Sequence, residues 1–350
     1  MSRSLLKSWF PHCETPVISN APMFGTAIAP MAAAVTNAGG LGFIGGGFDF
    51  KPESTQISSL DKQLTETASL LGQTPGQALN AGVGFITFDK SFANFIETVG
   101  PVLAKHKVAA VWLFAPTPSK PSAHAPVIPA LKEMGKSWGL KVFVMVGTVE
   151  AAREAMSDGA DVLVVQGVDA GGHQWAKGSG IISVVPEVCD MLKTEYKGRE
   201  VAVVAAGGIM DGRGIAAAMA LGAEGVVMGT RFVATKESPT PDSQKAILIE
   251  AEDGGATTIK DTVHDDIQST GFWPPLYDGR AMILDSYNDH KAGMSLADNV
   301  AKYKEAAAVG DNSRRNIWAG TGIGLIKDIP SSADVVKTSL KEVRDILGRL

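Results

Sequence analysis

The sequence predicts an α/β fold, a closed (β/α)8 or TIM barrel with a small, partly helical inserted lobe. Short apolar runs alternate with segments of helical periodicity, and this alternation implies a parallel sheet. Most of the runs are continuously apolar, as expected for strands that are buried on both faces. Eight such units within 350 residues fit one closed barrel with an additional lobe better than an open sheet.

Eight strands are expected, each in a run rich in β-branched and apolar residues. In chain order they span residues 17–23, 41–44, 82–86, 108–113, 141–146, 161–166, 201–206 and 225–228. Helices are expected between them at residues 30–38, 57–71, 91–106, 149–157, 184–192 and 211–221. Ser91, Thr148 and Asp211 are suitable N-cap residues for three of these helices, and glycines follow several helix ends.

The alternation breaks after the eighth strand, where prolines and paired aspartates interrupt the pattern. We therefore expect the main part of the barrel at residues 1–236, an inserted smaller lobe at 237–317, and a return to the barrel at 318–350. Residues 295–308 form the best helical pattern of the inserted lobe. The amphipathic segment 332–347 is expected to be the last barrel helix.

Composition and charge exclude several classes of protein. The net charge of −5 and the isoelectric point near 5.7 argue against a nucleic-acid partner. No window approaches the roughly 18 uninterrupted apolar residues of a membrane span. Cys13 and Cys189 have no C-x-x-C partner, which argues against a disulfide framework or a zinc site and favours a reducing, cytoplasmic location. Residues 348–350 faintly resemble a peroxisomal signal, which leaves the peroxisome as an alternative location.

His173 is the candidate catalytic residue. An apolar strand ends at Gln166, and a glycine-rich loop with Gly171 and Gly172 leads directly to this histidine. In a barrel of parallel strands, catalytic residues stand at the carboxyl ends of the strands, so this position favours function over a structural histidine. The other histidines lack this setting and lack metal-ligand spacing, so no metal is expected.

Two glycine-bearing turns after the last two strands indicate a phosphate site. The turns contain Ala206, Gly207 and Gly208, and Met228, Gly229 and Thr230. In many barrels these loops bind phosphate through backbone N–H groups, and Thr230 adds a hydroxyl donor. The alternative is that the glycines only permit tight turns. Arg231 either contacts the phosphate or pairs with a surface carboxylate.

Two further motifs are weaker. Residues 40–45 match G-x-G-x-x-G, but a helix precedes the motif and none follows promptly, so we interpret it as a false match to a dinucleotide site. Pro22 and Met23 end the first strand. They either lie against a flat aromatic ligand or belong to the core.

Together these segments resemble the nitronate monooxygenase family, formerly called 2-nitropropane dioxygenases. The resemblance runs from about residue 15 to 235 and resumes at 318–324. The segments that carry it are Pro22-Met23 and residues 33–42, 166–167, 170–173, 206–209, 228–232 and 318–324. Each motif is weak alone, whereas their order and spacing are specific.

The resemblance implies non-covalent FMN and the oxidation of alkyl nitronates, with neutral nitroalkanes as a further substrate class, by O2 to carbonyl compounds and nitrite. It implies cofactor contacts from Pro22, Met23, Gly84, Gln166, Gly171, Gly172, Ala206, Gly207, Gly208, Met228, Gly229 and Thr230. His173 corresponds to the family's active-site histidine. It would either take the α-proton of a neutral nitroalkane or, as imidazolium, hold the nitro oxygens of a nitronate.

The chain departs from the family pattern at several positions. Gly84 stands where many members have Asn, so an amide contact to the flavin is missing. Met145 replaces a Gln or Lys, Asp169 replaces a Glu, and Thr321 stands where bacterial members often have Gln. These changes concern flavin tuning and substrate choice rather than the fold.

Other functions remain open. One is an FMN-dependent NAD(P)H reductase of the enoyl-reductase type, a second is a tailoring flavin oxygenase acting on a larger metabolite, and a third is a non-catalytic flavin binder. A barrel of the IMP-dehydrogenase type is disfavoured, because it needs a nucleophilic cysteine on a barrel loop. The expected partners are a small-molecule substrate and O2, without nucleic acid or membrane, and a homodimer is an option. Residues 273–275 (Trp-Pro-Pro) form either a lobe hinge or a dimer contact, and Phe85, Trp112, Phe114 and Trp175 either line a pocket or pack elsewhere.

Overall fold

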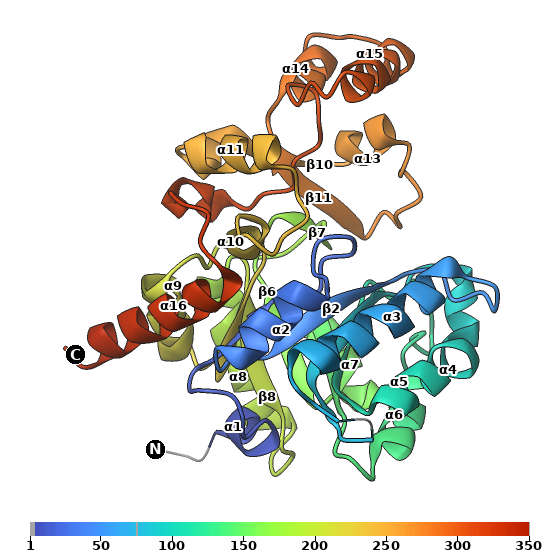
Figure 1. Cartoon of the computed structure of the whole chain (residues 1–350), viewed down its shortest axis with the longest axis vertical. Helices are drawn as coiled ribbons and strands as arrows, with labels where there is room; N and C mark the ends of the chain where they lie inside the picture. Colours follow the sequence, from blue (N-terminus) through green and yellow to red (C-terminus); the bar gives the residue numbers. More distant parts are fainter. Residues whose placement is uncertain (1–3, 75, 350) are drawn as a thin grey trace.

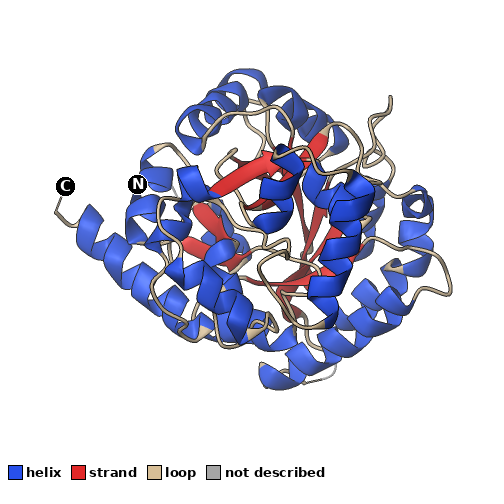
Figure 2. Ribbon diagram, turned by 90° about the horizontal axis from the view of Figure 1, so that it is seen from above, coloured by secondary structure: helices blue, strands red, loops and turns tan. Residues whose placement is uncertain are grey.

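Eight parallel strands form a barrel in the computed structural model, which describes residues 4–74 and 76–349. Seen from above, a ring of helices surrounds the strands (Figure 2). The barrel strands are β1 (Val17–Asn20), β2 (Gly42–Gly47), β3 (Leu79–Ile86), β4 (Val108–Phe114), β5 (Lys141–Val146), β6 (Val162–Gln166), β8 (Ala202–Ala206) and β9 (Gly225–Met228). The expected fold class and all eight expected strands are confirmed, with shifts of a few residues at their ends.

The barrel closes between its first two strands. The hydrogen-bonded order is β1-β9-β8-β6-β5-β4-β3-β2, which leaves β1 and β2 to meet. They do so through a single parallel bridge between Ser19 and Leu41, with the Leu41 N–H donating to the Ile18 carbonyl at 3.0 Å. The barrel is therefore nearly closed, with this one bridge joining β1 to β2.

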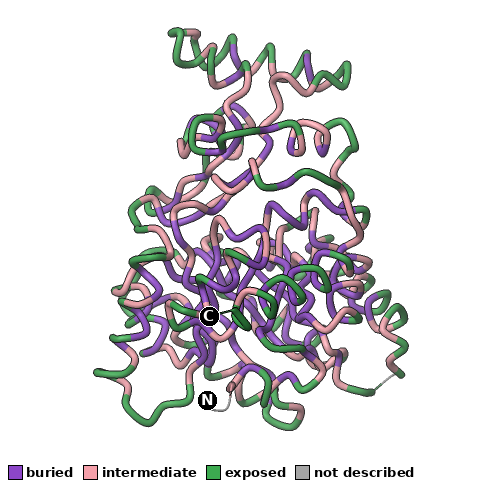
Figure 3. Tube along the Cα trace, turned by 90° about the vertical axis from the view of Figure 1, so that its left-hand side faces the viewer, coloured by how far each residue is buried: buried purple, intermediate pink, exposed green. Residues whose placement is uncertain are grey.

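Both faces of the strands are buried, which explains the continuous apolar runs. On β6, Val162 and Val164 belong to the cluster inside the barrel, whereas Leu163 and Val165 pack against the surrounding helices. Figure 3 shows this buried body below a more exposed upper part. Helix α1 (Leu5–Trp9) covers the amino-terminal end of the barrel, where the Phe10 ring lies 6.0 Å from that of Phe143.

The outer helices follow the expected order, with one helix broken. They are α2 (Ala29–Asn37), α3 (Thr55–Leu70), α4 (Phe95–Thr98), α5 (Gly100–His106), α6 (Val127–Gly135), α7 (Val149–Asp158), α8 (Ile181–Glu195), α9 (Gly212–Ala220) and α16 (Ser332–Leu347). The helix expected at 91–106 divides into a 3-10 turn, η1 (Lys90–Asn94), and helices α4 and α5. Pro101, which lacks an N–H, lies in the first turn of α5 and accounts for the break between α4 and α5. Thr148 and Asp211 are N-caps as expected, whereas Asp89 takes this role in place of Ser91.

The inserted lobe lies over the carboxyl ends of the barrel strands (Figure 1). Its elements, with the short helix and 3-10 turn that flank it, are α10 (Thr230–Val233), α11 (Asp242–Glu250), α12 (Gly254–Thr257), β10 (Thr258–Asp261), α13 (Val263–Gln268), β11 (Tyr277–Met282), α14 (Asp285–Lys291), α15 (Leu296–Ala308) and η2 (Thr321–Leu325). Strands β10 and β11 form an antiparallel sheet with β7 (Gly172–Trp175), which comes from the loop after β6. The domain boundaries stay a prediction, and this sheet crosses one of them.

Among the described residues, no helix combines the length and the apolar character needed to cross a membrane. Leu350, the last residue of the segment that resembles a peroxisomal signal, lies outside the described residues.

Candidate active site

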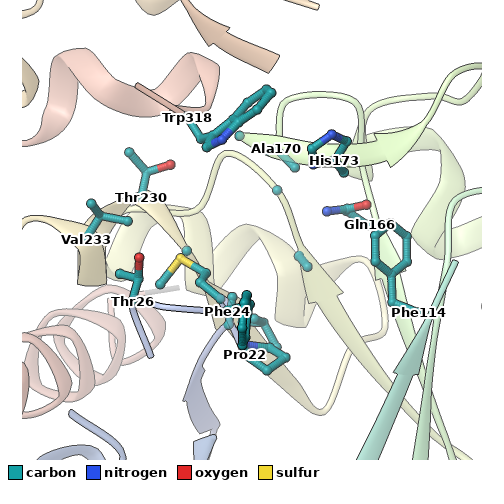
Figure 4. A pocket seen from close by; sticks show the side chains of 18 of the residues that line it. Pro22, Phe24, Thr26, Phe114, Gln166, Ala170, His173, Thr230, Val233 and Trp318 are labelled. Carbon is teal, nitrogen blue, oxygen red and sulfur yellow. The ribbon is translucent and has the colours of Figure 1, made fainter. Parts of the chain in front are cut away.

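A cavity of about 430 Å³ opens at the carboxyl ends of the barrel strands, beneath the inserted lobe. Figure 4 shows Thr230 and Gln166 on opposite sides of this space, and His173 with Trp318 above Pro22. The cavity is lined by these predicted site residues: Pro22, Met23, Gln166, Gly171, Gly172, His173, Ala206, Gly207, Gly208, Gly229 and Thr230. Segments far apart in the sequence therefore meet at one site.

Gly84 and Met228 do not line the cavity. Gly84 lies on β3 behind Pro22, and a Cβ atom at this position would overlap the proline ring. An Asn, which the resemblance described above would place here, has no room while Pro22 keeps its place, and this gives a packing reason for the missing amide. Met228 is 1% exposed and belongs to the core between strands and helices.

The three glycines of the expected phosphate cradle differ in why the structure accommodates glycine at each position. Gly207 and Gly208 have φ values of +105° and +73°, which glycine adopts without strain. A Cβ atom at Gly229 would meet only ordinary contacts, the nearest being Ala21 Cβ at 3.7 Å and Met23 Sδ at 3.8 Å. Packing within the chain therefore does not require glycine at position 229, whereas a ligand that approached this backbone closely would require it.

Thr230 is oriented by a backbone donor. Its Oγ1 accepts a hydrogen bond from the Gly320 N–H at 3.1 Å, which leaves its own hydroxyl proton free to donate. Arg231 does not contribute to the cradle. Its guanidinium binds the Asp328 carboxylate at 2.6 Å and the Asp328 carbonyl at 3.1 Å, so the surface-carboxylate alternative is correct.

Gln166 places an unpaired polar atom in the site. Its Oε1 is buried and has no hydrogen-bond partner within the described part of the chain. Leaving a buried acceptor unsatisfied costs about 1–3 kcal/mol, so such an atom needs an explanation. Because Gln166 lines the cavity, an N–H group on a bound ligand would satisfy it.

His173 lies on strand β7, which the sequence pattern did not predict, directly opposite Gly279 of β11. Its Nε2 is 2.9 and 3.0 Å from the two carboxylate oxygens of Asp265 in α13. The Trp273 ring stacks on the imidazole with centroids 3.7 Å apart and planes 8° from parallel. The inserted lobe thus holds this histidine by an acidic group and an aromatic face.

The cavity carries little charge of its own. His173 is the one titratable side chain among the described residues that line it, and no Lys or Arg lines it. No cluster of three or more His, Cys, Asp or Glu side chains that suits a metal occurs in residues 4–74 and 76–349. The side chains of this site supply one proton-transfer group, hydrogen-bond donors and acceptors, and apolar walls.

Cysteine chemistry finds no support in the structure. Burial raises the pKa of the Cys13 thiol to about 12 and also raises the pKa of Cys189. Neither thiol lines the cavity, and Cys189 lies within helix α8 as the sequence suggested. Both thiols are protonated near neutral pH, so neither is an activated nucleophile.

Several site residues were missed by the sequence reasoning. Asp265 is 92 residues from its partner His173, and no spacing rule connects them. Trp273 lines the cavity and stacks on His173, a role that neither the hinge nor the dimer hypothesis anticipated. Of the apolar candidates, Phe85, Trp112 and Phe114 line the cavity and Trp175 does not. The Trp-Pro-Pro segment was the one local signal for Trp273.

The sequence comparisons agree with one another. A family model described as nitronate monooxygenase matches residues 119–342. A nitronate monooxygenase of Neurospora crassa is 46% identical over 358 residues, which cover 99% of this chain and 93% of the relative. Another nitronate monooxygenase, from Metarhizium robertsii, is 34% identical, with 99% and 95% covered.

Solved structures share the fold. A structure of FabK from Thermotoga maritima matches with a TM-score of 0.73 and 25% identity, covering 100% of this chain and 98% of its own. A nitroalkane oxidase from Streptomyces ansochromogenes matches with a TM-score of 0.74 and 24% identity, covering 98% of this chain and 99% of its own. The second likeness concerns the fold alone.

Proposed function

The chain belongs to the nitronate monooxygenase family, and we propose on that premise that it binds FMN in the cavity and oxidises alkyl nitronates with O2. Two nitronate anions and one O2 balance to two carbonyl molecules and two nitrite ions. The observation that carries the proposal is one lobe-held histidine, His173, facing an uncharged cavity with a glycine and threonine cradle at its other side.

The residues present fit FMN. The unpaired Oε1 of Gln166 suits an N–H donor such as the isoalloxazine ring carries, and Pro22 and Met23 offer an apolar surface beside a flat ring. The backbone at Gly229 and the free hydroxyl proton of Thr230 suit a phosphate group. When bound, FMN would supply the electron transfer between nitronate and O2, which no side chain of the cavity supplies.

His173 handles the proton and the negative charge. With a neutral nitroalkane it would accept the α-proton as a general base. With a nitronate it would hold the nitro oxygens as an imidazolium. The apolar walls, including Phe114 and Trp112, keep water from the reacting carbon and strengthen these polar contacts.

An anaerobic absorbance experiment tests the proposal. The purified protein is loaded with FMN, and propyl nitronate or NADPH is added in separate cuvettes. We expect nitronate to diminish the absorbance of oxidised flavin and NADPH to leave it unchanged, and we expect nitrite on admission of air. Bleaching by NADPH alone would assign the protein to the reductase class, and failure to bind FMN would refute the cofactor assignment.

The proposed function also implies the partners and the cellular location of the enzyme. Its partners would be a small-molecule nitronate and O2, and its location the cytoplasm. The net charge of −5 supports the absence of a nucleic-acid partner. A homodimer is a prediction from the sequence that sedimentation analysis would check.

A further inference from the structure

We propose that Asp265 of the inserted lobe is a positioning residue that fixes the tautomer and the orientation of His173. This inference rests on the proposed function, since it concerns the histidine that the function uses. Asp265 itself does not line the cavity, so it acts through His173 and is not a catalytic residue.

The contact between the two side chains determines where the ring proton lies. A carboxylate only accepts hydrogen bonds, and both oxygens of Asp265 lie within 3.0 Å of His173 Nε2. Nε2 must therefore carry hydrogen in the neutral as well as the charged imidazole. Within the described chain, His173 Nδ1 has no hydrogen-bond partner, which leaves this nitrogen as the one that can accept a proton.

Asp265 is buried and itself well held. Its side chain is 4% exposed, and its Oδ1 accepts a second hydrogen bond from the Thr270 hydroxyl at 3.0 Å. The Thr270 N–H donates to the Asp265 carbonyl at 2.8 Å. The carbonyl of His264, the preceding residue, accepts from the Asn316 amide. A buried carboxylate needs a polar partner, and His173 is the partner that can carry positive charge.

The inserted lobe also fixes the plane and height of the imidazole ring. His173 pairs with Gly279 on β11, where a larger residue would overlap the Trp318 ring. Trp318 in turn lies 4.8 Å from the imidazole, and Trp273 stacks on it at 3.7 Å. Strand pairing, stacking and the carboxylate therefore restrict the same ring from three directions.

The other charged groups near His173 are bound elsewhere. Asp278 on β11 forms an ion pair with Lys260 on β10 at 3.2 Å, and Lys260 also donates to the carbonyls of Trp175 and Ala176. Burial raises the pKa of Asp278, while Lys260 and, more weakly, His173 lower it, so Asp278 lies near the imidazole without contacting it. Asp265 is thus the acidic group in direct contact with the imidazole.

A tautomer measurement tests the proposal on the holoenzyme without any substrate. Protein labelled with ¹⁵N-histidine gives ring-nitrogen shifts that distinguish Nε2–H from Nδ1–H, and the signal missing in His173→Asn assigns the residue. We expect Nε2–H in the wild type and in Asp266→Asn, an exposed neighbour on the same helix, and a loss of this preference in Asp265→Asn. An Nδ1–H tautomer in the wild type would overturn the proposal.

A double-mutant cycle separates positioning from general stabilisation. With a neutral nitroalkane, Asp265→Asn should lower kcat/KM roughly 10- to 100-fold, by analogy with the loss of a carboxylate that orients a metal-bound histidine. FMN affinity should be unchanged, and Asp265→Glu should restore part of the activity. In the His173→Asn background, Asp265→Asn should have no further effect.

The outcomes distinguish this inference from the proposed function. An equal loss from Asp265→Asn in both backgrounds would show a structural role and overturn the inference. A wild type that binds FMN but does not oxidise nitronates would overturn the proposed function. In that case the tautomer measurement still decides whether Asp265 positions His173.

Discussion

Replacing Thr230 with valine tests the proposed phosphate cradle with little change in side-chain shape. Thr230 lines the cavity beside Gly229, and it is 6% exposed. Its Oγ1 accepts from the Gly320 N–H at 3.1 Å, so the hydroxyl proton is available to a ligand. Valine removes both the acceptor for Gly320 and the donor for the ligand.

Losing the acceptor for Gly320 affects the stability of the protein, and losing the hydroxyl donor affects the affinity for FMN. Without cofactor, the buried Gly320 N–H loses its partner, which should lower the free energy of unfolding by about 1–3 kcal/mol. With cofactor, one hydrogen bond to a charged phosphate is lost, which is typically about 1.5–3 kcal/mol. At about 1.4 kcal/mol per factor of ten, the Kd for FMN should rise roughly 10- to 100-fold.

Flavin fluorescence titrations measure the binding loss, and chemical unfolding of the cofactor-free protein measures the stability loss. Riboflavin, which lacks the phosphate, should bind Thr230→Val and the wild type equally. Thr230→Ser keeps the hydroxyl and is the matched control. Equal FMN affinity of wild type and Thr230→Val, or an equal weakening of riboflavin, would refute the phosphate role of this hydroxyl.

Three further predictions concern other parts of the molecule. His173→Asn should keep FMN but lose turnover roughly 10²- to 10⁴-fold, most severely with neutral nitroalkanes, and steady-state assays showing unchanged rates would contradict its role. In Gly84→Asn the new side chain should overlap the ring of Pro22. This overlap should lower the free energy of unfolding by about 1–3 kcal/mol without tightening FMN binding. A variant of unchanged melting temperature that binds FMN more tightly would show that the ring can move. Burial lowers the pKa of His124 to about 3, so as pH falls below about 6.5 the unfolded chain takes up a proton at this residue before the folded chain does. Stability should therefore fall by about 1.4 kcal/mol per pH unit from this residue, and urea unfolding of His124→Gln should lack that contribution. Identical pH dependence in both proteins would argue against it.

The barrel strands were predictable because the reason for each is local. Val162 to Val165 are apolar at every position, since alternate residues face the interior and the helices. Helix breaks were harder. Pro101 divides the segment 91–106, and the sequence pattern of apolar residues continues across that break. The apolar periodicity indicates which residues are buried, but it does not indicate whether they belong to one continuous helix.

The residues of the candidate site also fall into two groups, those that a local sequence pattern places and those that only a tertiary contact places. Gln166 is the last residue of β6, Gly207 directly follows β8, and Thr230 lies two residues after the end of β9. Knowing each strand therefore gives the position of the residue at the cavity. Asp265 reaches His173 through the antiparallel pairing of β7 with β11, which joins segments about a hundred residues apart and leaves no local signature. Tertiary contacts of this kind cannot be deduced from spacing.

The two groups of site residues come from different parts of the molecule. The cradle residues belong to the barrel loops, whereas the groups that hold His173, namely Asp265 and Trp273, come from the inserted lobe. A change in the lobe should therefore alter proton handling while cofactor affinity stays the same, and a change at Thr230 should do the reverse. Because the proposed function assigns cofactor binding to the barrel and proton handling to the lobe, the measurements on Asp265 and Thr230 are independent tests of that function.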